Sequence, residues 1–241
     1  MHAYALGDLD DFFWPHTRWR AWEDGDGIEQ LALLYDEPDP PVLLALAEPP
    51  EATMDALFTA IEPELPARVY AHLSPRLVNV LAPRLVPESP PVAHYKLGLV
   101  DPSRLADRMD AGAVALWPED LDEVREFYAE AYPGTWFEPR MLETRRYVGI
   151  RDDGRLVCVA GVHVWSPTWS VAALGNVATV PGARGRGLAT AACAHLCRVL
   201  LEDGIDTIAL NVRADNAPAI AAYTVLGFEP VAQYEEVLLE A

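Results

Sequence analysis

The sequence has few cysteines, a single lysine and no long apolar run. Its three cysteines are too few for a disulfide framework, so we expect them to be small buried hydrophobic residues. No stretch approaches the roughly 18 apolar residues that a membrane-spanning helix needs, and the start MHAYALGDLDD lacks a signal-peptide pattern. These absences predict a cytoplasmic protein with no membrane partner.

Two of the cysteines, Cys193 and Cys197, lie one helical turn apart with His195 between them. A zinc site would need further ligands nearby, and in a helix His195 points away from the face that carries both cysteines. We therefore expect these residues to be part of a core and the protein to bind no metal.

The acidic charge of the chain argues against several classes of partner. Asp and Glu total 37 against 18 Lys and Arg, which gives a formal net charge of -19. This charge repels phosphate backbones, so we expect no nucleic-acid partner, and it equally disfavours anionic membrane surfaces. The hydrophobic fraction of 51% excludes wholesale disorder, and 241 residues suffice for one large domain or two modest ones.

Hydrophobic patterns divide the chain into two α/β halves. In the first half, residues 1–105, we expect a short helix and a loop over the first 24 residues. The elements expected after them are strands at 28–35, 42–47, 67–71 and 92–100 and helices at 52–61 and 74–85, the second capped by Ser74. The polar stretch 101–111 is expected to begin the link to the second half, residues 106–241.

The second half alternates strands and helices. The elements expected are strands at 113–116, 171–180, 208–212 and 230–239, helices at 118–132, 188–202 and 217–226, and a hairpin of 147–151 with 156–165. Asp152-Asp153-Gly154 joins the hairpin, because Asp-Gly is a favoured hairpin turn.

The segment 176–201 organises the second half. Small and β-branched residues at 177–180 suit a strand, and helical periodicity begins at Leu188. Between them lies the basic turn RGRG at 184–187. Unpaired N–H groups and the dipole at the start of a helix attract phosphate, and glycines let the backbone approach it closely. The turn therefore predicts a phosphate or pyrophosphate site.

A dinucleotide-binding loop of the form G-x-G-x-x-G is the alternative for this turn. Gly185 and Gly187 match its first two glycines, but Thr190 takes the third position. Pro181 also separates the strand from the glycines, whereas the dinucleotide motif follows its strand directly. The preferred interpretation is therefore a phosphate site in a fold other than the dinucleotide-binding fold.

Three patterns in this half resemble the GNAT superfamily of N-acetyltransferases. Arg184-x-x-Gly187-x-Ala189 matches that family's acyl-CoA pyrophosphate loop, and the strand NVATV stands immediately before it. LNVRADNAPAIAAYTVLGF, residues 210–228, resembles the family's fifth strand and the helix after it. Residues 176–228 look especially like the branch with glycine N-acyltransferase-like proteins, whose members often carry a degenerate GNAT-like half in front.

The resemblance implies an α/β (α+β) fold with a mixed, mostly antiparallel central sheet flanked by helices, preceded by a smaller related domain. It also implies acetyl-CoA as cosubstrate, its pantetheine arm lying where the fourth strand splays from the fifth. Asn216 would contact this cosubstrate, or cap the following helix, or both. The cofactor-binding residues carried over are Val177, Ala178, Thr179, Arg184, Gly185, Arg186, Gly187, Leu188, Ala189 and Asn216.

Acyl transfer to an amine needs a proton donor and a proton acceptor. Tyr223 matches the family tyrosine that stands beside the thioester sulfur and would act as the acid. The alternative is a purely structural role, in which Tyr223 is a packed residue of its helix. Many relatives use a glutamate of the fourth strand as the base, but SVAALGNVATV holds no carboxylate. His163 on the preceding strand is the candidate base. Further candidates are Asn176, to position a water or the substrate, and Glu138, Glu143 and Asn211.

We therefore expect an acyl-CoA-dependent N-acyltransferase that moves an acetyl group to the primary amine of a small molecule. Because the fourth strand lacks a carboxylate, a non-catalytic acyl-CoA-binding or sensing protein is the alternative. The first half could also be an independent interaction module. The expected assembly is a monomer or a homodimer.

Overall fold

The computed structural model describes residues 3–10, 14–25, 27–47, 51–82, 84–106 and 112–241. The chain groups into two compact units that are discontinuous in sequence. The first comprises residues 1–96, 213–215 and 231–241, and the second comprises 97–212 and 216–230. The domain boundary expected between residues 105 and 106 stays a prediction. Of the expected link, Pro102–Leu105 forms a short 3-10 helix, and 107–111 lie outside the described residues.

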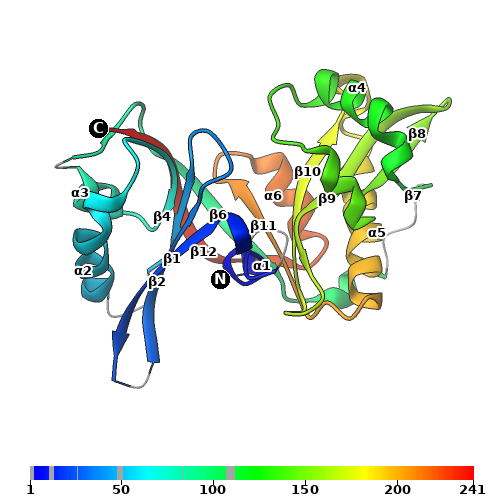
Figure 1. Ribbon diagram of the computed structural model, residues 1–241. Helices are drawn as coiled ribbons and strands as arrows, with labels where there is room; N and C mark the ends of the chain where they lie inside the picture. The colour runs from blue at the N-terminus through cyan, green and yellow to red at the C-terminus, as the bar shows by residue number, and fades with distance from the viewer. Residues whose placement is uncertain (1–2, 11–13, 26, 48–50, 83, 107–111) are drawn as a thin grey trace. The chain divides into compact units, whose positions relative to one another are not determined.

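The sheet of the second unit runs in the order β11-β10-β9-β8-β7 (Figure 1). β10 (Val171–Thr179) is parallel to β11 (Thr207–Arg213), whereas the other pairs are antiparallel. The remaining strands are β9 (Arg155–Ser166), β8 (Val148–Asp152) and β7 (Val114–Ala115). The turn between β8 and β9 uses Asp153 and Gly154 with positive φ, 50 and 81, as an Asp-Gly hairpin turn requires.

Helices cover both faces of this sheet. α4 (Leu121–Ala131) packs on β9 and β10 from one side, and α5 (Leu188–Glu202) packs on β8, β9 and β10 from the other (Figure 1). Both helices are amphipathic, so each buries one apolar stripe. The other helical segments are η4 (Pro118–Asp120), η5 (Pro139–Thr144), η6 (Pro181–Ala183) and α6 (Ala217–Thr224).

In the first unit, neighbouring strands follow the order β1-β2-β3-β4-β12. β3 and β4 are parallel, and the other neighbours are antiparallel. Its core consists of apolar side chains from α2, α3 and the sheet, among them Met54, Phe58 and Leu77. The elements with residues in this unit are α1 (Ala3–Gly7), η1 (Trp14–His16), β1 (Thr17–Asp24), β2 (Gly27–Tyr35), β3 (Val42–Ala45), α2 (Glu51–Ile61), η2 (Glu62–Glu64), β4 (Arg68–Leu73), α3 (Leu77–Leu81), β5 (Val86–Pro87), β6 (Val92–Leu99) and β12 (Phe228–Glu240). The last two strands also have residues in the second unit.

The mixed, mostly antiparallel sheet with flanking helices confirms the predicted fold class. Two local predictions are wrong. Residues 17–24 form strand β1 and not the expected loop. The sequence pattern did not reveal this strand, because it is largely exposed and therefore lacks an apolar alternation. The helix expected over 74–85 is only Leu77–Leu81: Arg76 before it is left-handed (φ 76), and the Ser74 hydroxyl accepts a hydrogen bond from the Ala47 N–H instead of capping the helix.

The described part of the chain offers neither a membrane-spanning helix nor a metal site. None of its helices is both long enough and apolar enough to cross a membrane. Nor do the described residues include a group of three or more His, Cys, Asp or Glu side chains that could hold a metal ion.

Candidate functional site

The site begins where β10 stops pairing with β11. The two strands are in register from Val171 with Thr207 to Leu174 with Leu210. On its other edge β10 pairs with β9, but this ladder contains two register shifts. One leaves His163 as an extra residue in β9, and the other leaves an extra residue in β10 between Gly175 and Ala178. Such bulges bend a strand and redirect its side chains.

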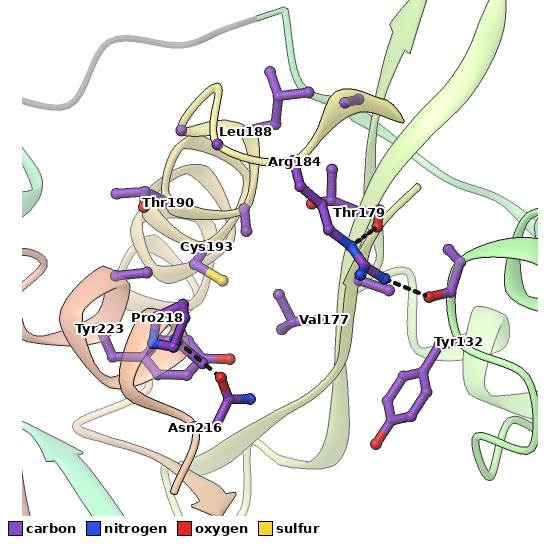
Figure 2. Close-up of a pocket in the computed structure, with 18 residues that line it drawn as sticks. Tyr132, Val177, Thr179, Arg184, Leu188, Thr190, Cys193, Asn216, Pro218 and Tyr223 are labelled. Atoms are coloured by element: carbon purple, nitrogen blue, oxygen red, sulfur yellow. Dashed lines mark hydrogen bonds between the residues drawn. The ribbon is translucent and has the colours of Figure 1, made fainter. Parts of the chain in front are cut away.

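A cavity of about 600 Å³ lies beside this bulged end of β10. Its size is in the range typical of small-molecule sites. β10, the start of α5, the end of α4 and one side of α6 surround it, as Figure 2 shows. Ten of the predicted cofactor and catalytic residues line it: Val177, Ala178, Thr179, Arg184, Gly185, Gly187, Leu188, Ala189, Asn216 and Tyr223. His163 and Arg186 are not among the lining residues.

The glycine turn presents backbone to the cavity. Gly185 and Gly187 both have φ 76, a left-handed conformation that favours glycine, and no atom outside their chain neighbours lies within 4 Å of a Cβ built on either. Gly187 directly precedes α5, so the first N–H groups of this 15-residue helix have no partner within the helix. With the helix dipole they make a site suited to an anion.

Arg184 reaches across the cavity between two elements. Its Nε donates to the carbonyl of Thr179 at 3.1 Å, and its Nη2 donates to the carbonyl of Ala131 at 3.3 Å (Figure 2). The guanidinium therefore joins the end of β10 to the end of α4 and leaves positive charge at the cavity. Arg186 instead pairs with Asp152 at 2.7 Å, with both side chains about half exposed.

Asn216 and Tyr223 lie on the α6 side of the cavity. The Asn216 Oδ1 accepts a hydrogen bond from the Ala219 N–H at 3.3 Å, so this residue caps α6 and also lines the cavity. The Tyr223 ring packs edge-on against Phe228 at 5.9 Å between centroids and is 9% exposed. Figure 2 shows its hydroxyl pointing into the space in front of Val177. A phenol placed there can give a proton to a bound group.

Asn176 holds the bulge of β10 with a buried side chain in a left-handed backbone conformation (φ 54). Its Oδ1 accepts from the hydroxyl of Thr135 at 3.0 Å and lies 3.0 Å from Nε2 of His163. Its Nδ2 donates to the hydroxyl of Tyr147 at 3.0 Å, and its carbonyl accepts from the hydroxyl of Tyr128 at 2.7 Å. Burial raises the pKa of both tyrosines, which keeps them neutral hydrogen-bonding partners. This network was not predicted, although asparagine is one of the few residues that tolerate a positive φ.

The cysteines are buried free thiols, as expected. Burial raises the pKa of Cys158 to about 11, although Thr179 donates a hydrogen bond to it, and raises the pKa of Cys197 to about 12. Cys193 lines the cavity, and burial raises its pKa as well. Thiols with raised pKa values are poor nucleophiles and poor metal ligands, so packing is their role.

Comparisons with known proteins agree that the chain resembles acetyltransferases. The family model described as acetyltransferase (GNAT) family matches residues 114–228. The chain is similar to a mycothiol acetyltransferase of Beutenbergia cavernae, 32% identical over 53% of this chain and 41% of the relative. It is also similar to the [ribosomal protein bS18]-alanine N-acetyltransferase of Escherichia coli, 35% identical over 42% of this chain and 67% of the relative.

The fold has a solved counterpart in a GCN5-related N-acetyltransferase from Kribbella flavida. The TM-score is 0.61 at 23% identity, and the match covers 100% of this chain and 95% of that one. At this identity the likeness shows the fold alone. The chain spans about half the length of the mycothiol acetyltransferases that it matches, 41% and 56% for two of them.

Proposed function

Because this chain belongs to the acetyltransferase (GNAT) family, we propose that it is an acyl-CoA-dependent N-acyltransferase that moves an acetyl group from acetyl-CoA to the primary amine of a small molecule. The observation that carries the proposal is the cavity between the bulged end of β10 and the glycine turn at the start of α5. This cavity is lined both by an anion site, the glycine turn at the start of α5, and by the phenol of Tyr223.

The residues around the cavity suit acetyl-CoA, which supplies the activated acyl thioester. N–H groups of the turn from Arg184 to Ala189 would bind its pyrophosphate, and backbone groups of Val177–Thr179 would bind the amides of its pantetheine arm. The open space at the Cβ positions of Gly185 and Gly187 supports this, since a phosphate needs close approach to backbone N–H groups. Asn216 would contact the same molecule while it caps α6.

Tyr223 is the proposed general acid. In the reaction the amine nitrogen bonds to the acyl carbon, and the bond from that carbon to sulfur breaks. Tyr223 gives its proton to the departing sulfur and regains one from solvent. A positioned proton transfer of this kind typically contributes about 10²–10⁴-fold in rate. The N–H groups of β10 near Val177 would stabilise the negative charge on the carbonyl oxygen, a contribution often worth about 10²–10³-fold.

A panel of amines tests the proposal. The full chain is incubated with acetyl-CoA and ethanolamine, tyramine, glucosamine or alanine amide, and release of coenzyme A and formation of the acetylated amine are measured. Tyr223→Phe should slow turnover well beyond tenfold with little change in the Kd of acetyl-CoA. Tyr95→Phe in the first unit is the matched control, and its turnover should equal that of the wild type. Unchanged turnover in Tyr223→Phe would remove this residue from the mechanism.

One observation favours a second candidate, a non-catalytic acyl-CoA-binding or sensing protein. Among the described residues that line the cavity, none is Asp, Glu or His, so the cavity wall itself offers no strong proton acceptor. Tight binding of acetyl-CoA without acetylation of any amine on a broad panel would support this candidate against the enzyme.

The first unit would be a degenerate copy of the second. In both, two antiparallel strands are followed by a third antiparallel strand, a helix and a parallel strand: β1-β2-β3-α2-β4 repeats the order β8-β9-β10-α5-β11. Where the second unit has its glycine turn, the first has the sequence Glu48-Pro49-Pro50-Glu51. Prolines lack an N–H and glutamates repel phosphate, so we expect no second acyl-CoA site there.

Several finer assignments stay predictions. They are the place of the chain in the glycine N-acyltransferase-like branch, Arg186 as a cofactor ligand, the small-molecule amine as acceptor, the cytoplasmic location and the monomeric or homodimeric state.

A further inference from the structure

The two bulges bring His163 and Asn176 together and fix the orientation of the imidazole. The ring of His163 occupies the space that a side chain at residue 175 would need: a Cβ built on Gly175 would lie 2.2 Å from Cδ2 of His163. Trp136 packs edge-on against the same ring, with centroids 5.7 Å apart. With Nε2 held 3.0 Å from the Oδ1 of Asn176, the ring is constrained by three neighbours.

The hydrogen-bond network also decides which nitrogen of His163 carries the proton. The hydroxyl of Tyr147 has one proton, and its two acceptors are the carbonyl of Val162 at 3.2 Å and the Sδ of Met141 at 3.3 Å, so toward the amide of Asn176 this hydroxyl accepts. The amide must therefore turn its Nδ2 toward Tyr147 and its Oδ1 toward His163. An amide oxygen cannot donate, so Nε2 of His163 is the donor, and in the neutral ring Nδ1 is the basic nitrogen.

We propose that Asn176 is a positioning residue that holds Nε2 of His163 as a hydrogen-bond donor and thereby makes Nδ1 the atom that receives a proton from the amine acceptor. This inference rests on the proposed N-acyltransferase function. As the new bond from nitrogen to carbon forms, the amine gives up one proton. Because His163 does not line the cavity, the proton passes to Nδ1 through a water molecule, and the imidazolium then releases it to solvent.

Asn176→Asp tests the inference with a side chain of the same shape. A carboxylate against Nε2 favours the imidazolium form, so the pKa of His163 should rise by about one unit. On the acidic side of the pH profile, kcat/KM should then fall about tenfold, because fewer molecules hold a neutral Nδ1. The pKa is measured by NMR titration of the imidazole C2 proton, identified by its absence in His163→Gln. The kinetic profile is measured with whichever of the four panel amines is acetylated fastest.

Thr135→Val is the matched control. It removes the other hydrogen bond to the Oδ1 of Asn176 without placing a charge near Nε2. We expect it to lower the melting temperature while the pKa of His163 and the pH profile stay at their wild-type values. A merely structural role of Asn176 predicts that the acidic limb of the pH profile keeps its wild-type position in Asn176→Asp, even where the carboxylate raises the pKa of His163.

His163→Gln keeps the experiment decisive if Asn176→Asp fails to fold. Glutamine can still donate to Asn176 but cannot titrate, so the acidic limb of the profile should disappear and kcat should fall on the order of 10²-fold. A limb that persists in this variant, or that stays in place while the pKa of His163 rises in Asn176→Asp, overturns the inference. If the wild type acetylates no amine, the proposed function fails and the proton-accepting role falls with it, while the NMR titration still shows whether Asn176 controls His163.

Discussion

Replacing Asp8 with asparagine should remove a pH dependence of stability from the first unit. Asp8 follows α1 and is 8% exposed, and Lys96 of β6, the only lysine of the chain, is 4% exposed. The ammonium of Lys96 lies 4.2 Å from the ring centroid of Tyr4. Burial raises the pKa of Asp8 to about 7 against the opposing charge of Lys96, and burial lowers the pKa of Lys96 to about 8 against Asp8 and Glu236.

The sign follows from where the proton binds better. Asp8 binds its proton more tightly in the folded chain than in the unfolded chain, where its pKa is 3.8, so stability is lost as pH rises through about 7. One proton changes the free energy of unfolding by about 1.4 kcal/mol per pH unit, which gives about 2 kcal/mol between pH 5.5 and 7.5. Glu236 does not contribute in this window. Burial opposes its ionisation, but the charges of His72 and His94 together with the hydrogen bonds from Tyr70 and Tyr234 lower its pKa below 4.5.

Urea unfolding of the full chain at several pH values from 5.5 to 7.5, followed by tryptophan fluorescence, measures this difference. The free energy of unfolding of the wild type should gain about 2 kcal/mol over Asp8→Asn as the pH falls through this range. Asp122→Asn is the control, because the Asp122 side chain is 97% exposed and its removal should leave the wild-type slope. Equal slopes for the wild type and Asp8→Asn would refute the reasoning.

Two further predictions concern the cavity and the bulge of β10 beside it. Arg184→Glu places a negative charge beside the glycine turn and removes the hydrogen bonds to the carbonyls of Thr179 and Ala131, so the Kd of acetyl-CoA measured by calorimetry should rise at least about tenfold. Arg125→Glu reverses an exposed charge and should leave this Kd unchanged. An unaltered Kd for Arg184→Glu would disprove the pyrophosphate assignment. Gly175→Ala forces the ring of His163 away, so turnover should fall on the order of 10²-fold with little change in acetyl-CoA affinity. Gly182→Ala is the control, because its Cβ position is open space, and it should behave as the wild type. Full turnover in Gly175→Ala would contradict the role of His163.

Most of the second unit could be predicted because its signals are local. The Asp-Gly turn of the β8–β9 hairpin and the glycine that ends α5, Gly204 with φ 82, are set by residues adjacent in sequence. The first unit was predicted less well. Strand β1 is exposed on most of its length, so apolar periodicity does not reveal it, and the left-handed Arg76 breaks a helix that its neighbours would otherwise favour.

For the candidate site, too, local features could be predicted from the sequence and long-range contacts could not. The glycine turn and the strand before it are contiguous, and the resemblance that they carry pointed to ten residues that do line one cavity. Sequence could not show that Arg186 turns away to pair with Asp152, because that partner comes from a distant hairpin. Nor could it show that His163 contacts Asn176 and does not line the cavity.

The sequence by itself determined the strand, basic glycine turn and helix of residues 176–201, since β-branched residues, glycines and a 3.6-residue periodicity act over a few neighbours. Only the tertiary structure decided which polar atoms meet at the bulge. There Thr135, Tyr147 and His163 come from three different segments to satisfy one buried asparagine. A buried amide must find partners wherever packing places them, and that requirement has no local pattern in the chain.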